Sequence, residues 1–69
     1  MRRKPVKSSV VRSIGYDPES KTMELEFSDG SLYEYYSVPA AIHRRLMEAD
    51  SIGGFLNRFV VPGYKSRKI

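Results

Sequence analysis

The clearest pattern in the chain is a strict alternation of hydrophobic and polar residues over positions 22–27. Met23, Leu25 and Phe27 share one face of an extended chain, and two glutamates share the other. A period of two residues predicts a half-buried β-strand. The preceding residues 10–16 are rich in valine and isoleucine, which favour strands. We therefore expect an earlier strand to pair with this one.

Two turns connect the predicted strands. Residues 17–21 contain Asp17 and Pro18. Proline presets φ for a turn, and aspartate accepts a hydrogen bond from the backbone that follows it. Residues 28–30, with the sequence Ser-Asp-Gly, predict a hairpin that returns the chain as a third strand over residues 31–36.

The geometry of the hairpin turn decides where two tyrosines lie. A two-residue turn would place Tyr33 and Tyr35 on the outer face with the glutamates. A three-residue turn with Gly30 in the left-handed conformation leaves a bulge and shifts the register by one residue, which exchanges the two faces. Tyr33 and Tyr35 then point inward and Glu34 points outward. We favour the bulged turn because it keeps the acids out of the core and the two large rings inside it.

After residue 38 the hydrophobic spacing becomes that of a helix. Pro39 suits the first position of a helix, where its missing N–H removes no hydrogen bond. Ile42, Leu46 and Ala49 follow at helical spacing and predict one buried stripe.

A second, shorter helix is predicted after Asp50 or Ser51, either of which can cap its first turn. Pro62 and Gly63 end this helix. Its apolar residues are Ile52, Phe55, Leu56, Phe59 and Val60. Together the elements predict an α+β fold, in which a three-stranded antiparallel meander is followed by two short helices packed on one face.

Length and composition are those of one small globular domain, with 69 residues, 41% of them hydrophobic and 29% charged. We expect residues 1–8 to form a flexible basic arm, residues 9–64 the domain and residues 65–69 a basic tail. The absence of cysteine excludes disulfides and thiolate zinc sites, and one histidine cannot form a metal site alone. No apolar run approaches the roughly 18 residues that span a bilayer. We therefore expect a cytoplasmic protein with no membrane contact, metal or cofactor.

Charge is separated along the chain. Residues 1–16 carry five cations and no acid, whereas residues 17–34 carry six acids and one lysine. Residues 51–69 add four more cations. If the two ends meet in space, as termini often do, their cations would form one positive patch.

Cations beside exposed aromatic rings suit nucleic acids, because cations neutralise phosphates and rings stack on bases. Arg44 and Arg45 are expected on the solvent side of the first helix. Tyr36 and Tyr64 lie outside the predicted inner stripe and are the expected stacking residues. The full predicted nucleic-acid-binding set is Arg44, Arg45, Arg58, Tyr64, Lys65, Arg67, Lys68 and Tyr36.

Other polar residues have a structural interpretation beside a functional one. Residues 51–54 (Ser-Ile-Gly-Gly) could present backbone N–H groups to an anion, or their glycines could allow close packing. Asn57 could bind a ligand or tie down a loop. His43 has no neighbouring nucleophile or orienting carboxylate, so no catalytic residue is predicted and we do not expect an enzyme.

The same residues give the chain a resemblance to the KTSC domain. This short bacterial module is named for its place at the C-terminus of some lysyl-tRNA synthetases, and it also occurs as a small protein by itself. The resemblance spans residues 9–64. It is carried by Ile14-Gly15-Tyr16-Asp17, Tyr33-Glu34-Tyr35, Val38-Pro39, Leu46, Ala49, Ser51, Gly53, Phe55 and Asn57. The chain departs from the family pattern at Gly54, where relatives more often carry a large side chain, and over residues 61–63.

The resemblance implies structural roles for Gly15, Tyr16, Tyr33, Tyr35, Pro39, Ser51, Gly53, Phe55 and Asn57. It also implies RNA binding, the usual suggestion for the family. Our leading hypothesis is therefore a small non-catalytic module that binds RNA or a related phosphate-bearing ligand. Two alternatives remain open. One is a protein-interaction or self-assembling module, since the acidic middle and basic ends are complementary. The other is a binder of a nucleotide-type small ligand at a subunit interface.

Overall fold

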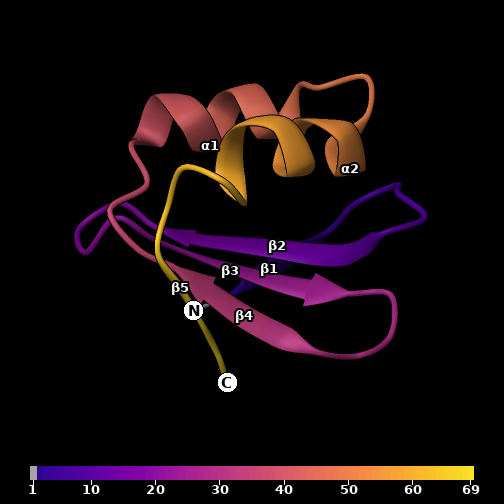
Figure 1. The fold of residues 1–69 in the computed structure, drawn as a ribbon, viewed down its shortest axis with the longest axis horizontal. Helices are drawn as coiled ribbons and strands as arrows, with labels where there is room; N and C mark the ends of the chain where they lie inside the picture. The colour runs from indigo at the N-terminus through magenta and orange to yellow at the C-terminus, as the bar shows by residue number, and fades with distance from the viewer. Residues whose placement is uncertain (1) are drawn as a thin grey trace.

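The computed structural model describes residues 2–69 as two layers, a sheet and a pair of helical segments that cover one of its faces (Figure 1). The sheet is an antiparallel meander in the order β1-β2-β3-β4-β5. The elements are β1 (Arg3–Pro5), β2 (Val11–Asp17), β3 (Thr22–Phe27), β4 (Leu32–Tyr35), α1 (Ala40–Met47), α2 (Ile52–Phe55), η1 (Leu56–Val60) and β5 (Ser66–Lys68). The α+β class and the two helices on one face are as the sequence predicts.

The sheet has five strands, so the prediction of three was wrong. The two additional strands are β1 and β5, which occupy the segments expected to be a flexible arm and a basic tail. Hydrogen bonds continue beyond both strands, from Val6 N–H to the Arg12 carbonyl (3.1 Å) and from Ile69 N–H to the Leu32 carbonyl (2.9 Å). Strands of three residues are too short to show a hydrophobic period, which explains why the sequence did not predict them.

The hairpin between β3 and β4 contains the bulged turn. Gly30 adopts φ +90°, and the Phe27 N–H donates to the Ser31 carbonyl at 2.9 Å. In the resulting register Leu25 pairs with Tyr33 and Met23 pairs with Tyr35. Tyr35 is only 5% exposed and Tyr33 packs against the core. The prediction that both tyrosines point inward is confirmed.

The core lies between the inner face of the sheet and the two helical segments. Leu46 is the fully buried residue of α1, and Ile42 is half-buried beside it. The fully or nearly fully buried apolar residues are Val11, Ile14, Met23, Leu25, Tyr35, Val38, Leu46, Ile52, Leu56 and Val60. These side chains come from both layers, so the helices are held to the sheet by one continuous apolar cluster.

The second helical segment begins at Ser51, whose Oγ accepts a hydrogen bond from the Gly54 N–H at 3.0 Å. This is one of the two caps that the sequence predicts. The segment continues from α2 into η1, a single π-helical turn closed by Val61 N–H and the Leu56 carbonyl. Phe59, one of the apolar residues of this segment, has a side chain that is 44% exposed. Ile52, Leu56 and Val60, spaced four residues apart, face the sheet. Phe55 and Phe59 lie beside this stripe.

The helical layer covers one face of the sheet (Figure 1). The other, outer face carries polar side chains. Glu24 of β3 lies opposite Glu34 of β4, and Arg67 of β5 lies opposite Glu34 on the other side. Arg3 of β1 forms an ion pair with Glu24. The basic edge strands therefore flank the acidic central strands.

Candidate nucleic-acid interface

Two arginines and two phenylalanines meet on the surface of the helical layer. The Arg45 guanidinium carbon of α1 lies 5.7 Å from the ring centres of both Phe55 and Phe59. The Arg58 guanidinium carbon lies 5.9 Å from the ring centre of Phe59. The two rings contact each other in a tilted arrangement with centres 4.9 Å apart. We call Arg45, Phe55, Arg58 and Phe59 the arginine–phenylalanine patch.

The arginine–phenylalanine patch has a ring that is open to solvent and held in place. Phe59 is 44% exposed, whereas Phe55 is half-buried and packs against the core. A hollow of about 290 Å³ adjoins the rings and is lined by Ala49, Ser51, Gly54, Phe55, Arg58 and Phe59. An exposed ring between two guanidinium groups can stack with another flat, electron-rich group, such as a nucleobase.

The arginines of this surface are available to bind anions. Within residues 2–69 the Arg3–Glu24 pair is the one salt bridge, so Arg44, Arg45 and Arg58 are not neutralised by a carboxylate. All three are exposed. The sequence predicts these three arginines as phosphate contacts, and the structure brings Arg45 and Arg58 to the same aromatic ring.

The remaining predicted residues lie in other places. Tyr36, Tyr64 and Lys65 line a separate hollow of about 380 Å³. The Tyr36 hydroxyl donates to Glu34 at 2.9 Å, and this hydrogen bond raises the pKa of the tyrosine. A phosphate there would lie near the Glu34 carboxylate.

Arg67 and Lys68 belong to β5 rather than to a free tail. Arg67 lies opposite Glu34, and Lys68 pairs in register with Tyr33. The expectation that the basic ends form one positive patch was therefore wrong in part, since Arg3 and Arg67 lie with the glutamates of the sheet. Unlike charges on neighbouring strands attract, which explains this placement.

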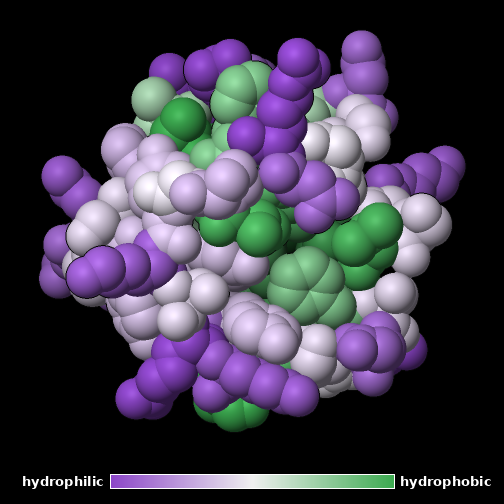
Figure 2. Space-filling view, viewed as in Figure 1, coloured by the Kyte–Doolittle hydropathy of each residue, from purple (hydrophilic) through white to green (hydrophobic). Residues whose placement is uncertain are grey.

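Hydrophobic and hydrophilic side chains are unevenly distributed on the surface of the molecule. Figure 2 shows hydrophobic side chains in the middle of one face, with hydrophilic side chains projecting around its rim. The large apolar residues most exposed in the described part of the chain are Val10, Phe59, Val61 and Ile69. Of these four, Phe59 alone is aromatic, and it contacts two arginines.

The only histidine in the chain lies between the helical layer and the sheet. His43 is half-buried, and its imidazole stacks on Tyr16 of β2. Desolvation lowers the pKa of His43 below its usual 6.5. The Tyr16 hydroxyl donates to the Val38 carbonyl. No group with the geometry of a general base and nucleophile pair is formed by these residues.

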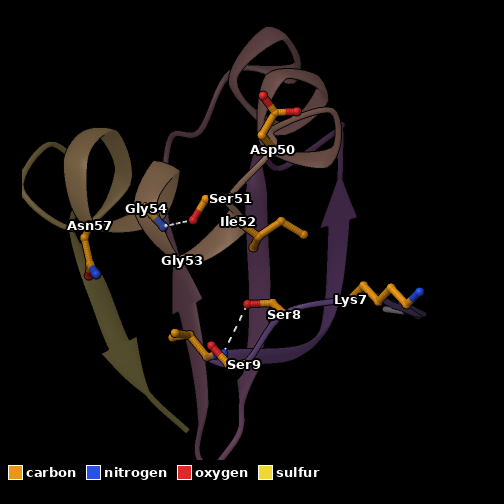
Figure 3. Close-up of a pocket in the computed structure, with 10 residues that line it drawn as sticks. Lys7, Ser8, Ser9, Asp50, Ser51, Ile52, Gly53, Gly54 and Asn57 are labelled. Carbon is orange, nitrogen blue, oxygen red and sulfur yellow. Dashed lines mark hydrogen bonds between the residues drawn. The ribbon is translucent and has the colours of Figure 1, made fainter.

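Beside the arginine–phenylalanine patch lies a second hollow of about 310 Å³, which Figure 3 shows in close-up. It lies between residues 7–10 and residues 50–57. Its polar lining includes Lys7, Ser8, Ser9, Ser51 and Asn57. We call it the serine-lined hollow. The sequence suggests its second half at Ser51 and Asn57, but nothing in the sequence indicates that residues 7–10 lie against that segment.

The sequence does not reveal the importance of Phe59. In the sequence the ring is one of five apolar residues in the predicted second helix, and nothing there marks it as exposed. The sequence signal that could have indicated it is the presence of an arginine in each predicted helix, Arg45 and Arg58, near enough to contact the same ring.

The residues to which we assigned structural roles contribute as follows. Gly15 is buried in β2, Pro39 precedes α1, and Ser51 caps α2. Gly53 lies so close to the preceding loop that an added Cβ would be 2.9 Å from Val10 Cγ2. Asn57 is exposed, and its side chain makes no hydrogen bond among residues 2–69, so the loop-tying role does not apply.

The fold and this surface define a small α+β domain with glutamates and arginines together on its sheet face and a basic, aromatic helical face. None of the helices formed by residues 2–69 has the length and apolar character needed to cross a bilayer. The same residues contain no cluster of side chains suited to hold a metal ion.

The chain belongs to the KTSC domain family, whose model matches residues 7–64. A crystal structure of a KTSC domain protein from Yersinia pestis superposes with a TM-score of 0.96 at 38% identity, covering 99% of this chain and 96% of that one. An uncharacterised protein from Stutzerimonas stutzeri is 47% identical over 62 residues, which are 90% of this chain and 87% of that protein. A lysine–tRNA ligase from Nostoc is 33% identical over 61 residues, 88% of this chain but 11% of the ligase.

Proposed function

We propose that this protein binds single-stranded RNA through the arginine–phenylalanine patch. The observation that carries the proposal is Phe59, an exposed ring (44%) whose centre lies 5.7 Å from the Arg45 guanidinium carbon and 5.9 Å from that of Arg58. A base can stack on this ring while the guanidinium groups contact the adjoining phosphates. Stacking of one base on one aromatic residue contributes roughly 1–3 kcal/mol.

The distribution of charge supports this side of the molecule as the binding face. On the outer face of the sheet, Arg3 and Arg67 lie beside the glutamates of β3 and β4, which offset their positive charge. The helical layer carries Arg44, Arg45 and Arg58 without a carboxylate partner among residues 2–69. A negatively charged strand would therefore be attracted more strongly to the helical face than to the opposite one.

The relatives add one supporting fact. A segment homologous to this chain forms part of a lysine–tRNA ligase, an enzyme whose name gives tRNA as its substrate. RNA is therefore the first ligand to test.

The test is a fluorescence anisotropy titration with a short labelled single-stranded RNA at several salt concentrations. We expect Phe59→Ala to weaken binding about 5- to 150-fold, which corresponds to the loss of one stacked base. Arg45→Ala and Arg58→Ala should each weaken binding and reduce the slope of log K against log salt by about 0.7.

Two matched variants serve as controls. Val61→Ala removes an apolar side chain that is 48% exposed but lies outside the patch, and it should bind as the wild type does. Arg12→Ala removes one exposed cation from β2 and tests whether any arginine would have the same effect. The proposal is wrong if the wild type binds RNA no better than millimolar at low salt, or if Phe59→Ala binds as tightly as Val61→Ala.

A further inference from the structure

The serine-lined hollow adjoins the hollow beside Phe59. Both are lined by Ser51 and Gly54. Gly54 is exposed, and the Ser51 side chain lies beside it, with Oγ 3.0 Å from the place that a Cβ of Gly54 would occupy. A ligand that extends one nucleotide beyond a base on Phe59 would therefore pass Ser51 and Gly54 to reach the serine-lined hollow.

The walls of the serine-lined hollow are held by local hydrogen bonds and close packing. Ser8 Oγ accepts from the Val10 N–H at 3.1 Å and the Val11 N–H at 3.4 Å, which fixes the loop of residues 7–10. Across the hollow, Ser51 Oγ accepts from the Gly54 N–H. Gly53 permits the close approach of the two walls, since a Cβ there would contact Val10. The shape is thus formed before any ligand arrives.

Four uncharged polar residues and two charged residues line this space. The hydroxyl oxygens of Ser8 and Ser51 each accept from backbone N–H groups, so each hydroxyl still has its O–H to donate. Asn57 offers an amide donor and an amide acceptor, neither of which is used within residues 2–69. Lys7 and Asp50, which have opposite charges, lie at different edges of the hollow and extend away from its middle in Figure 3. A phosphate is therefore a poor match for the middle of this hollow, and a neutral group with donors and acceptors is a good one.

We propose that the serine-lined hollow binds the neutral part of a nucleotide adjacent to the base stacked on Phe59, with Asn57 as the residue that determines specificity. The inference rests on the proposed function. The recognised group is either a base edge or a ribose hydroxyl, both of which present hydrogen-bond donors and acceptors. The volume of the serine-lined hollow, about 310 Å³, is at the lower end of the range for small-molecule sites.

The experiment measures the affinities of short homo-oligonucleotides of each base, as RNA and as DNA, for the full chain. A base-edge contact makes the wild type prefer one base, and a ribose contact makes it prefer RNA over DNA of the same sequence. We expect a preference of about tenfold. Asn57→Ala should weaken binding of the preferred oligonucleotide by about the same factor, so that the preference disappears.

Two further variants separate this inference from the proposed function. Phe59→Ala should weaken the binding of every oligonucleotide by a similar factor and keep the wild-type preference for one base or for RNA. Glu48→Gln changes an exposed residue just beyond α1 that does not line the hollow, and it should also keep the preference. Asn57 is exposed, and a thermal melt of Asn57→Ala will show that the variant is folded.

The inference is overturned if the wild type shows neither preference, or if Asn57→Ala retains the preference of the wild type. In both cases the effect of Phe59→Ala on overall affinity would still support RNA binding. If no oligonucleotide binds at all, the proposed function itself fails. The two failures are therefore distinguishable in one set of titrations.

Discussion

The imidazole of His43 lies flat against the ring of Tyr16, with ring centres 4.6 Å apart and planes inclined by 8°. This stack joins α1 to β2, and the Tyr16 hydroxyl is fixed by its hydrogen bond to the Val38 carbonyl. A stacked, half-buried imidazole is less solvated than a free one. The neutral form is therefore favoured in the folded protein.

We expect the stability of the protein to fall as the pH drops below about 6.5. Burial lowers the pKa of His43 in the folded state, so the unfolded chain binds the proton more tightly. The stabilising effect is complete above the unfolded pKa and is lost as the pH falls through the folded pKa. Melting temperatures between about pH 7.5 and 5.5 will measure this, because histidine alone has an ordinary pKa in that range.

His43→Phe keeps a ring on Tyr16 but cannot be protonated. Its melting temperature should change less with pH than that of the wild type over the same range. An NMR titration of the His43 imidazole should give a midpoint below 6.5. A midpoint above that value, or equal pH dependence in both proteins, would contradict the prediction.

A second prediction concerns the ion pair that holds β1 to the sheet. Arg3 pairs with Glu24, and its Nε–H donates to Ser13 Oγ at 3.0 Å. Arg3→Ala should lower the free energy of unfolding by about 1 kcal/mol, because the pair is partly exposed. Hydrogen exchange at the Val6 N–H should become faster. Lys4→Ala is the matched control, since it removes a charge from the same strand without an ion pair, and an equal effect of both variants would refute the role of Arg3.

The third prediction concerns the bulged turn. Gly30 has φ +90°, and no atom lies within 4 Å of the place that a Cβ would occupy, so a substitution there meets conformational strain without a clash. Gly30→Ala should cost about 1–2 kcal/mol in the free energy of unfolding. Gly30→Asn should cost less, because asparagine tolerates positive φ. Chemical denaturation measures both, and equal stability of the alanine variant and the wild type would exclude strain at this turn.

The fourth prediction concerns the contact between Gly53 and Val10. A Cβ at residue 53 would lie 2.9 Å from Val10 Cγ2, so Gly53→Ala should cost roughly 1–3 kcal/mol. Val10 is 39% exposed, and Val10→Ala alone should have a small effect. The double variant should recover part of the loss, because the clashing methyl group is gone. A double-mutant cycle with no coupling energy would show that the two residues do not contact each other.

Much of the central fold follows from local patterns. The alternation from Met23 to Phe27 predicts β3, and the bulged turn at Gly30 follows from the need to keep the glutamates out of the core. Ser51 is one of two predicted caps. These features depend on residues near one another in the chain, so spacing and turn chemistry are enough to determine them.

The candidate site is predicted less completely. Arg45 and Arg58 are recognisable as cations, but the ring that they share, Phe59, stands in the sequence only as one apolar residue of the second helix. Tyr36 and Tyr64 do line one hollow with Lys65, apart from the arginine–phenylalanine patch. Which face of a short helix is buried depends on the angle at which the helix packs on the sheet. That angle cannot be predicted from the spacing of hydrophobic residues.

By itself, the sequence determined the β-hairpin, the inward tyrosines, the order of the central strands and helices, and the separation of charge along the chain. Only the tertiary structure decided where those charges lie. The basic ends pair as edge strands beside the glutamates, Phe59 is exposed between two arginines, and the loop of residues 7–10 forms a wall of the serine-lined hollow. The physical reason is range: local patterns act within a few residues, whereas these contacts join segments far apart in the chain and form only when both layers are packed together.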